Sequence, residues 1–173
     1  MDRGQTVETE RLILRPPSPD DFGALHRIFS DAVTMSFWPV PFTEEDTRRW
    51  ISRSLHDHEE TGFGRCPVLL KSSGEVIGDC GIMRAEIAGE PEYDLGYIIH
   101  HPFWGNDYAV EAAEACKRHA VERLGIRRLV ANMPTAHAAS IRVAEKISMR
   151  WEKTFRNPRN RYIETHLYAL VAA

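Results

Sequence analysis

The sequence predicts an α+β (mixed α/β) fold built around one central sheet of mixed strand direction. Three observations predict it. Segments with a hydrophobic period of two alternate with segments of helical spacing, in the order β-α-α-β-β-β-α-β-α-β-β. Two strands in the middle of the chain are joined by a short turn, which implies antiparallel pairing. A strand, a long helix and a further strand follow, which implies a right-handed parallel unit in the same sheet.

The first third of the chain supplies one strand and two helices. Glu10–Arg15 alternates leucines with polar neighbours, as a short strand does, and two prolines end it. Ser18 is expected to cap a helix that has a proline at its first position and acidic residues in its first turn. A second helix is expected to begin after Thr43 and to run to about Glu60. A loop rich in proline and aromatic residues, Ser36–Phe42, precedes it.

The middle third is expected to form three strands. Cys66–Leu70 and Val76–Ile82 are separated by a Ser-Ser-Gly turn, which indicates a hairpin. The acidic, glycine-bearing segment Glu86–Glu92 is predicted to be a loop. A further strand, Tyr93–Ile99, follows it, and Pro102 ends that strand.

The last third alternates helices and strands. The longest helix is expected from Asn106 to about Leu124, with Gly125 as its C-terminal stop. The elements expected after it are a strand at Leu129–Asn132, a helix at Ala138–Ile147 and two strands at Trp151–Phe155 and Ile163–Val171.

Composition limits the class of protein. The 173 residues, 43% of them hydrophobic, suit one globular domain spanning residues 1–173. The net charge of -3 argues against a nucleic-acid partner. No apolar run approaches the ~20 residues that a membrane span needs. The first ten residues lack the apolar core of a signal peptide. A cytoplasmic protein with no membrane partner is therefore expected.

The cysteines and histidines favour structural roles. Cys66, Cys80 and Cys116 are scattered and lack metal-ligand spacing, so they are interpreted as small buried residues. A catalytic cysteine is the alternative, although no feature singles one out. His100 and His101 are adjacent on a predicted strand and should point to opposite faces, so no metal site is expected.

A glycine turn precedes the longest helix. Residues 103–113 read FWGNDYAVEAA. A helix N-terminus has unpaired N–H groups and about half a positive charge, which suits a phosphate. Asp107 places a carboxylate where an anion would arrive. Repulsion across ~5 Å at an effective dielectric of ~20 would weaken binding on the order of 100-fold, unless the side chain turns to solvent. The alternative is that Asp107 stabilises the first helical turn.

Four segments together resemble the GNAT acyltransferases, and among them the RimJ/RimL type of ribosomal-protein N-acetyltransferases. The resemblance covers nearly the whole chain in order and spacing. It is specific because the four segments agree. The segments are ETERLILRP at residues 8–16, YDLGY at 93–97, HPFWGNDYAVEAA at 101–113 and ASIRVAEKISM at 139–149.

The resemblance implies a three-layer fold in which a mostly antiparallel sheet of six to seven strands is flanked by about four helices. It implies that Tyr93–Ile99 and Leu129–Asn132 are a splayed parallel pair, and that acetyl-CoA, the acyl donor, lies between them. The residues that it implies for contact with acetyl-CoA are Ile98, Ile99, His100, Trp104, Gly105, Asn106, Asp107, Tyr108, Ala109 and His137.

Several positions depart from the family pattern. Pro102 replaces a basic residue or glutamine, and Asp107 replaces a second small residue in the turn. His137 stands where the family often has asparagine, and it can still donate a hydrogen bond. Ala144 stands where many members have a tyrosine as general acid. Ser148 replaces a glycine at a position that can require a left-handed backbone.

Acetyl transfer to an amine needs a base, donors for the oxyanion and a proton for the departing thiolate. Asp94, on the strand face of Gly96 and Ile98, is the candidate base, acting directly or through water. The alternative is an acid paired with a neighbouring arginine. Ser140 is the candidate donor to the carbonyl oxygen or the thiolate. Its alternative is a cap at the start of a helix.

Three aromatic features remain open. Tyr97 lies on the opposite strand face and is expected to pack in the core. Tyr168 either faces the cleft or packs in the sheet. The loop Ser36–Phe42 either lines the acceptor pocket or fills the space between two helices.

The predicted function is that of an acetyl-CoA-dependent N-acetyltransferase acting as a monomer or homodimer. The amine acceptor is either a protein N-terminal α-amino group or a small molecule. The alternative is a catalytically impaired CoA-binding or ligand-sensing protein on the same fold, suggested by Asp107, His137 and Ser148. A nucleotide-binding domain is disfavoured, because the chain lacks a Walker lysine and a G-x-G-x-x-G pattern.

Overall fold

A computed structural model describes residues 5–172, which form an eight-stranded sheet in the order β1-β2-β3-β4-β5-β6-β8-β7. The strands are β1 (Val7–Glu8), β2 (Leu12–Leu14), β3 (Arg65–Leu70), β4 (Val76–Ile87), β5 (Glu90–Ile99), β6 (Arg128–Pro134), β7 (Arg150–Asn157) and β8 (Ile163–Val171). The helices are α1 (Phe22–Phe29), α2 (Glu44–Thr61), α3 (Tyr108–Glu122) and α4 (Ala138–Lys146), with 3-10 turns η1 (Pro19–Asp21) and η2 (His101–Phe103).

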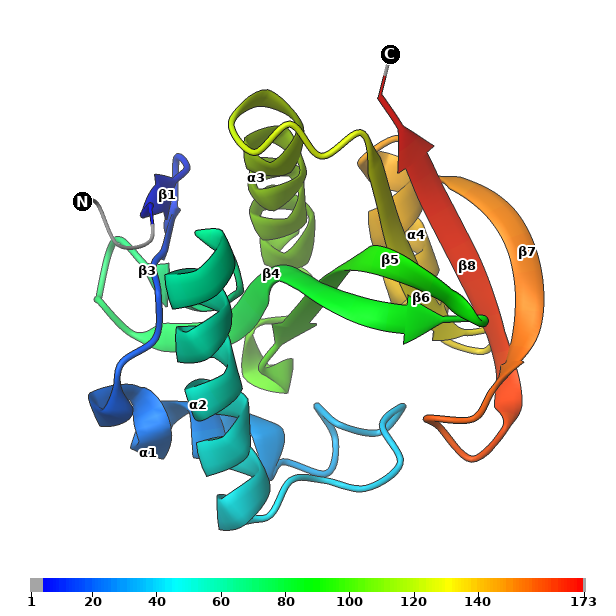
Figure 1. Cartoon of the computed structure of the whole chain (residues 1–173). Coiled ribbons are helices and arrows are strands. Elements are labelled where there is room, and N and C mark those ends of the chain that lie inside the picture. Colours follow the sequence, from blue (N-terminus) through cyan, green and yellow to red (C-terminus); the bar gives the residue numbers. More distant parts are fainter. Residues whose placement is uncertain (1–4, 173) are drawn as a thin grey trace.

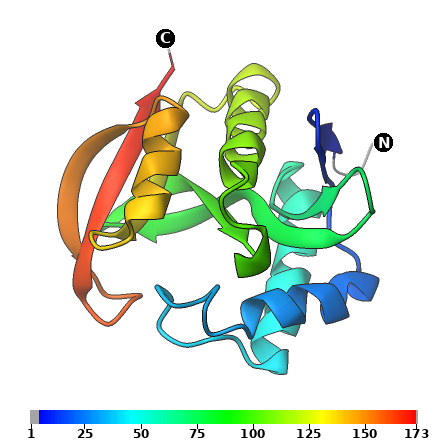
Figure 2. The ribbon, with the colours of Figure 1, turned by 180° about the vertical axis from the view of Figure 1, so that it is seen from behind.

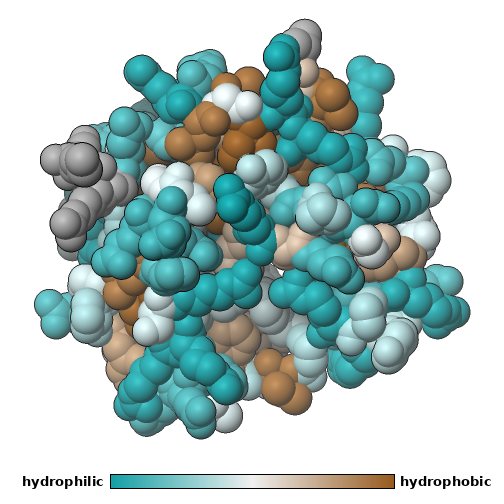
Figure 3. Space-filling model, viewed as in Figure 1, coloured by the Kyte–Doolittle hydropathy of each residue, from teal (hydrophilic) through white to brown (hydrophobic). Residues whose placement is uncertain are grey.

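The helices form two layers on the sheet, with α1 and α2 on one face and α3 and α4 on the other (Figures 1 and 2). The face of α3 that meets the sheet is made of small buried residues such as Ala112, Ala113 and Cys116, which let the helix approach closely. A second cluster, which includes Phe29 of α1 and Ile51 of α2, fills the other face. The face seen in Figure 3 is mostly hydrophilic, with hydrophobic residues in separate patches.

The predicted fold class is confirmed. The pair β5–β6 is parallel and is connected through α3, and the other pairs of the described sheet are antiparallel. Eight strands are present where six to seven were expected, because the two-residue β1 pairs with β2. A strand of two residues is too short to show any hydrophobic period.

The predicted loop at residues 86–92 is wrong. Instead, β4 and β5 continue to a tight hairpin whose turn is Ala88-Gly89, and Ile87 pairs with Glu90. Both turn residues have positive φ angles, 53° at Ala88 and 84° at Gly89. Such a turn suits the right-handed twist of a two-residue hairpin. The acidic composition that suggested a loop belongs to the two arms of this hairpin.

The parallel pair separates almost as soon as it forms. Asp94 opposite Val130 is the one pairing of β5 with β6. Beyond it, β5 stays paired to β4 as far as Ile99 opposite Gly78, while β6 stays paired to β8. The edge of β5 from Leu95 to Ile99 therefore faces a wedge instead of a neighbouring strand.

The cysteines have the expected structural character. Cys66, Cys80 and Cys116 are free and buried, and burial raises the pKa of Cys66. A buried thiol that stays protonated is a poor nucleophile, so the alternative of a catalytic cysteine is disfavoured. Within residues 5–172, no helix combines the length and apolar character needed to cross a membrane.

Candidate active site

A cleft of about 690 Å³ occupies the wedge between β5 and β6. Its walls also include the starts of α3 and α4, the loop between α1 and α2, and the turn between β7 and β8. The sequence-predicted site residues that line it are Asp94, Ile98, Ile99, Trp104, Gly105, Asp107, Tyr108, Ala109, His137 and Ser140. His100 and Asn106 do not line it. The side-chain amide of Asn106 instead donates to Phe103 O at 3.1 Å and closes the turn.

The start of α3 offers free backbone donors to this cleft. Trp104 N–H donates to His101 O at 3.1 Å. From Gly105 to Val110, the N–H groups have no hydrogen-bond partner within the part of the chain that the structure describes. Glu111 N–H, bonded to Asp107 O at 3.0 Å, begins the helical pattern. Consecutive free amides at a helix N-terminus are suited to bind a phosphate or diphosphate.

The carboxylate of Asp107 is part of an ion pair, so this turn does not carry an unpaired negative charge. Its backbone is left-handed, with φ of 58°, and its side chain is 67% exposed. One carboxylate oxygen accepts a hydrogen bond from Lys146 Nζ at 2.8 Å. Lys146, at the end of α4, also lowers the pKa of Asp107. Asp107 makes no side-chain cap on α3, so its role is an ion pair between α3 and α4.

His137 is the N-cap of α4. Its Nδ1 accepts a hydrogen bond from Ser140 N–H at 3.0 Å, whereas the sequence suggested His137 as a donor. Burial lowers the pKa of His137 to about 4, so the ring is neutral at pH 7 and its Nδ1 lone pair is available for the cap. The ring lies edge-on to Phe37 with centroids 4.0 Å apart.

Ser140 and Tyr97 form a hydroxyl pair at the cleft wall. Ser140 Oγ donates to Tyr97 Oη at 3.1 Å, and Tyr97 Oη donates to Ser140 O at 2.8 Å. Tyr97 packs against the α3–α4 face as expected, but its hydroxyl also reaches the cleft. Burial raises the pKa of Tyr97, which keeps the hydroxyl protonated. The polar tip of a tyrosine next to Ile98 was the signal that could have identified it.

Asp94 lies at the apex of the wedge, where β5 and β6 still touch. Its Oδ1 accepts a hydrogen bond from Asn132 Nδ2 of β6 at 3.0 Å. Burial raises the pKa of Asp94, and the positive charge of Arg65 opposes that rise. A carboxylate with a raised pKa is a better base than an exposed one. The hydrogen-bond partner of Asp94 is Asn132, which the sequence analysis missed, since the two residues are far apart in the chain.

Some residues of the loop between α1 and α2 line the cleft, and others fill the space between the two helices, so each of the two expectations holds for part of the loop. Phe37 and Trp38 line the cleft, whereas Phe42 packs against Phe29 with ring centroids 5.2 Å apart. Asn160, in the β7–β8 turn, donates from Nδ2 to Phe37 O at 2.8 Å. This bond ties the two loops that flank the cleft. Tyr168 does not line the cleft; its hydroxyl donates to Glu145 Oε1 at 3.2 Å.

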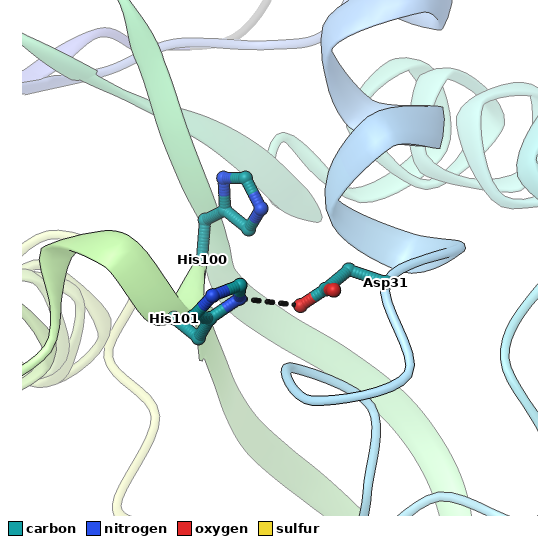
Figure 4. Close-up of side chains that lie close together, drawn as sticks. All are labelled: Asp31, His100 and His101. Carbon is teal, nitrogen blue, oxygen red and sulfur yellow. Dashed lines mark hydrogen bonds and ion pairs between the residues drawn. The ribbon is translucent and has the colours of Figure 1, made fainter.

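His100, His101 and Asp31 lie together where the end of β5 meets the loop after α1 (Figure 4). Each offers one potential ligand atom, and the three atoms lie within 4.8 Å of one another. The opposite-face argument does not hold for the two histidines, because β5 ends at Ile99 and His101 begins η2. His101 Nδ1 is hydrogen-bonded to Asp31 Oδ2 at 2.7 Å, and Thr34 N–H donates to the same oxygen. The cluster ties the loop after α1 to the end of β5, and the absence of a metal site stays a prediction.

A sheet that opens at its parallel pair, beside a helix whose first amides are free, is the architecture of the acyltransferase class that the sequence resembles. The chain belongs to the GNAT acetyltransferase family, because the family model described as an acetyltransferase (GNAT) domain matches residues 11–150.

The chain is also similar to individual relatives and solved structures. The chain is 32% identical over 149 residues to an uncharacterized protein, YkkB, of Bacillus subtilis, covering 86% of this chain and 87% of the relative. A GNAT-family acetyltransferase structure from Bacillus anthracis is 28% identical, covers 96% of this chain and 98% of its own, and has a TM-score of 0.83. RimL, a ribosomal α-N-protein acetyltransferase solved in complex with coenzyme A, is 19% identical, covers 97% of this chain and 98% of its own, and has a TM-score of 0.79. The likeness to RimL is one of fold.

Proposed function

We propose that this protein is an acetyl-CoA-dependent N-acetyltransferase that moves an acetyl group to a primary amine. The observation that supports the proposal most directly is the row of free N–H groups from Gly105 to Val110, which opens onto the wedge between β5 and β6. These donors would hold the diphosphate of acetyl-CoA. The RimL structure that holds coenzyme A has the same fold, which supports this choice of donor.

The charges around the turn favour an anion. Asp107 is paired with Lys146, so the single carboxylate at the turn is largely compensated. Arg142 of α4 lines the same cleft and adds a positive charge. The edge of β5 from Leu95 to Ile98 would pair with the amide groups of the pantetheine arm, since its backbone groups lack a neighbouring strand on that side. The carbonyl of Ile99 already accepts a hydrogen bond from Trp104 Nε1 at 2.7 Å.

In the proposed reaction, Asp94 receives a proton from the acceptor ammonium, directly or through water. The neutral amine attacks the thioester carbonyl carbon, a C–N bond forms and the C–S bond breaks. The Tyr97 hydroxyl, kept protonated by its buried surroundings, is placed at the cleft wall to donate a proton to the departing thiolate. The nitrogen of the new amide loses its second proton, which would return through solvent to the Tyr97 phenolate, while the Ser140 hydroxyl stabilises that phenolate through its hydrogen bond.

The acceptor is proposed to be a protein α-amino group or a small amine, and the protein a monomer or homodimer. Calorimetry with acetyl-CoA, followed by acetylation assays with peptides and small amines, tests the function. We expect micromolar binding and turnover of at least one amine. No binding at millimolar acetyl-CoA would refute the proposal.

A catalytically impaired CoA-binding or ligand-sensing protein is the alternative. The left-handed backbone of Ser148, with φ of 67°, favours it, because a family glycine has been replaced where a side chain causes strain. Tight binding of acetyl-CoA with no acetylation of any amine would support this alternative.

A further inference from the structure

The cleft holds a buried arginine that the proposed reaction does not use. Arg65, at the start of β3, has a side chain that is 4% exposed. Its Nε donates to Asp79 Oδ1 at 2.5 Å, and its Nη2 donates to Asp79 O at 3.4 Å. Its guanidinium also lies 5.2 Å from the centroid of the Trp50 ring. Asp79 and Trp50 therefore hold the guanidinium in one position.

The remaining nitrogen of Arg65 has no hydrogen-bond acceptor among the residues that the structure describes. Nη1 lies against Gly96 of β5, where a Cβ atom would overlap it. Glycine at 96 is thus what allows the guanidinium to lie on this face of β5. Across residues 5–172, no group accepts a hydrogen bond from Nη1, yet Arg65 lines the cleft. The guanidinium is charged and largely removed from water, so a ligand oxygen that reaches Nη1 from the cleft would make a charge-assisted hydrogen bond.

The charges of this part of the cleft point to the same kind of ligand. Arg65 and Arg159 both line the cleft, whose two carboxylates are those of Asp94 and Asp107, and Asp107 is paired with Lys146. Arg159 makes no ion pair with any described residue. Asp79 compensates Arg65 but does not line the cleft. A polyamine would bring a second positive charge close to two arginines, whereas an oxygen with negative charge would be attracted to them.

We propose that Arg65 Nη1 binds an oxygen of the carboxylate or carbonyl group attached to the α-carbon of the acceptor (the α-oxygen) while Asp94 receives the proton of its amine. The acceptor would then be an α-amino acid or a peptide N-terminus, not a polyamine or an amine that lacks such an oxygen. Asp94 and Gly96 lie on the same strand face, two residues and about 6.6 Å apart, a spacing that an α-amine and its neighbouring oxygen can bridge. The side chain of the acceptor would contact Trp38, Trp50 and Met83. This inference rests on the proposed N-acetyltransferase function.

The test compares acceptors that differ only at the α-carbon. For phenylalanine, methionine and alanine, the probes are the free amino acid, its amide and the amine without the carboxyl carbon. We expect kcat/KM to be at least 10-fold higher for the amino acid or the amide than for the bare amine. A higher kcat/KM for the acid would indicate that the acceptor is a free amino acid. A higher kcat/KM for the amide would indicate that the acceptor is a peptide N-terminus.

Variants then assign this preference to Arg65. The double variant Arg65→Met/Asp79→Asn removes both charges, so it leaves no uncompensated buried ion. We expect it to lower kcat/KM at least 10-fold for the acceptors with the α-oxygen and less than 3-fold for the bare amines. For each acceptor, the kcat/KM of the variant is divided by that of the wild type. This ratio removes the effect of differences in amine basicity between acceptors. Arg65→Lys keeps the charge but changes the donor geometry, and it should lose part of the preference.

Circular dichroism and acetyl-CoA calorimetry check that each variant is folded. If the variants lower kcat/KM equally for all acceptors, Arg65 has a structural role and the inference is overturned. Equal kcat/KM of the wild type for all three probe types would also overturn it. If only polyamines are acetylated, the inference fails while the N-acetyltransferase function stands. If acetyl-CoA binds and no amine is acetylated, the function itself fails, and calorimetry of the same probes with the CoA-bound protein then decides whether Arg65 recognises the α-oxygen.

Discussion

At the scale of single residues, the pKa values of two aspartates of the cleft are shifted in opposite directions by their surroundings. Asp94 is partly buried beside Asn132, and burial raises its pKa, whereas exposed Asp107 has its pKa lowered by Lys146. Strand alternation predicted which face Asp94 occupies, because that signal is local. The sequence could not predict Asn132 as its partner, since the contact depends on how β5 meets β6.

Asp94→Asn tests the base. The amide keeps the shape of the carboxylate but cannot accept a proton, so we expect kcat to fall by roughly 10²–10⁴-fold. Because a base acts when deprotonated and its pKa is raised, the wild type should lose activity as pH falls through a value above the ordinary pKa of aspartate. This acidic limb should be absent in the variant. A variant with unchanged kcat and an unchanged pH profile would exclude Asp94 as the base, provided that acetyl-CoA binding is intact.

Asp107 and Lys146 form the second residue-scale test. Since their charges are paired, we expect Asp107→Asn to change acetyl-CoA affinity by less than about 3-fold. Lys146→Met should weaken binding more, because it leaves the carboxylate unpaired beside the diphosphate.

The double variant Lys146→Met/Asp107→Asn should recover most of the affinity lost in Lys146→Met. Calorimetry of the four proteins closes the cycle. If Asp107→Asn alone tightens binding about 100-fold, the ion pair does not compensate the carboxylate, and the idea of an impaired binding protein gains support.

At the scale of elements, boundaries with local signals could be predicted and the β4–β5 hairpin could not. Thr43 caps α2 by accepting a hydrogen bond from Asp46 N–H at 3.1 Å, and Gly62 ends the helix with φ of 77°. Both signals lie within one turn of the helix end. The hairpin turn at Ala88-Gly89 lies among acidic residues that are unusual in strands, and the pairing of two long strands overrode their weak propensity.

Ser148 tests the strain predicted after α4. Its φ of 67° is left-handed, as the replacement of a family glycine suggested. We expect Ser148→Gly to raise the free energy of unfolding by about 0.5–1 kcal/mol. Glycine relieves the strain of a left-handed backbone, and the greater freedom of the unfolded chain offsets part of this gain.

Urea denaturation measures this change. Gly125→Ala is a matched control, because Gly125 has the same φ of 67° and a Cβ there would meet no atom within 4 Å. By the same balance of backbone strain and unfolded-chain freedom, the control should destabilise by about 0.5–1 kcal/mol. A Ser148→Gly variant less stable than the wild type would show that the serine side chain has an unrecognised stabilising role.

At the scale of the whole molecule, the wedge depends on strand order. No local pattern in β5 or β6 says that the two strands part after Asp94, because each keeps a full set of pairs with its other neighbour. The sequence therefore indicated the wedge through family resemblance and not through periodicity. The same limit applies to Arg65 and Gly96, whose contact crosses three neighbouring strands, β3, β4 and β5.

The wedge and the free amides of α3 predict how acetyl-CoA changes the whole protein. Ligand at 100 times its Kd should raise the free energy of unfolding by about 2.7 kcal/mol, because it binds the folded state alone. We expect the amides from Gly105 to Val110 to exchange hydrogen quickly in the free protein, since they have no described partner, and slowly once acetyl-CoA is added. Exchange measured by NMR, beside thermal denaturation, tests both. Thermal stabilisation with no slowing at these amides would mean that the ligand binds elsewhere, since a diphosphate held by the start of α3 must occupy these donors.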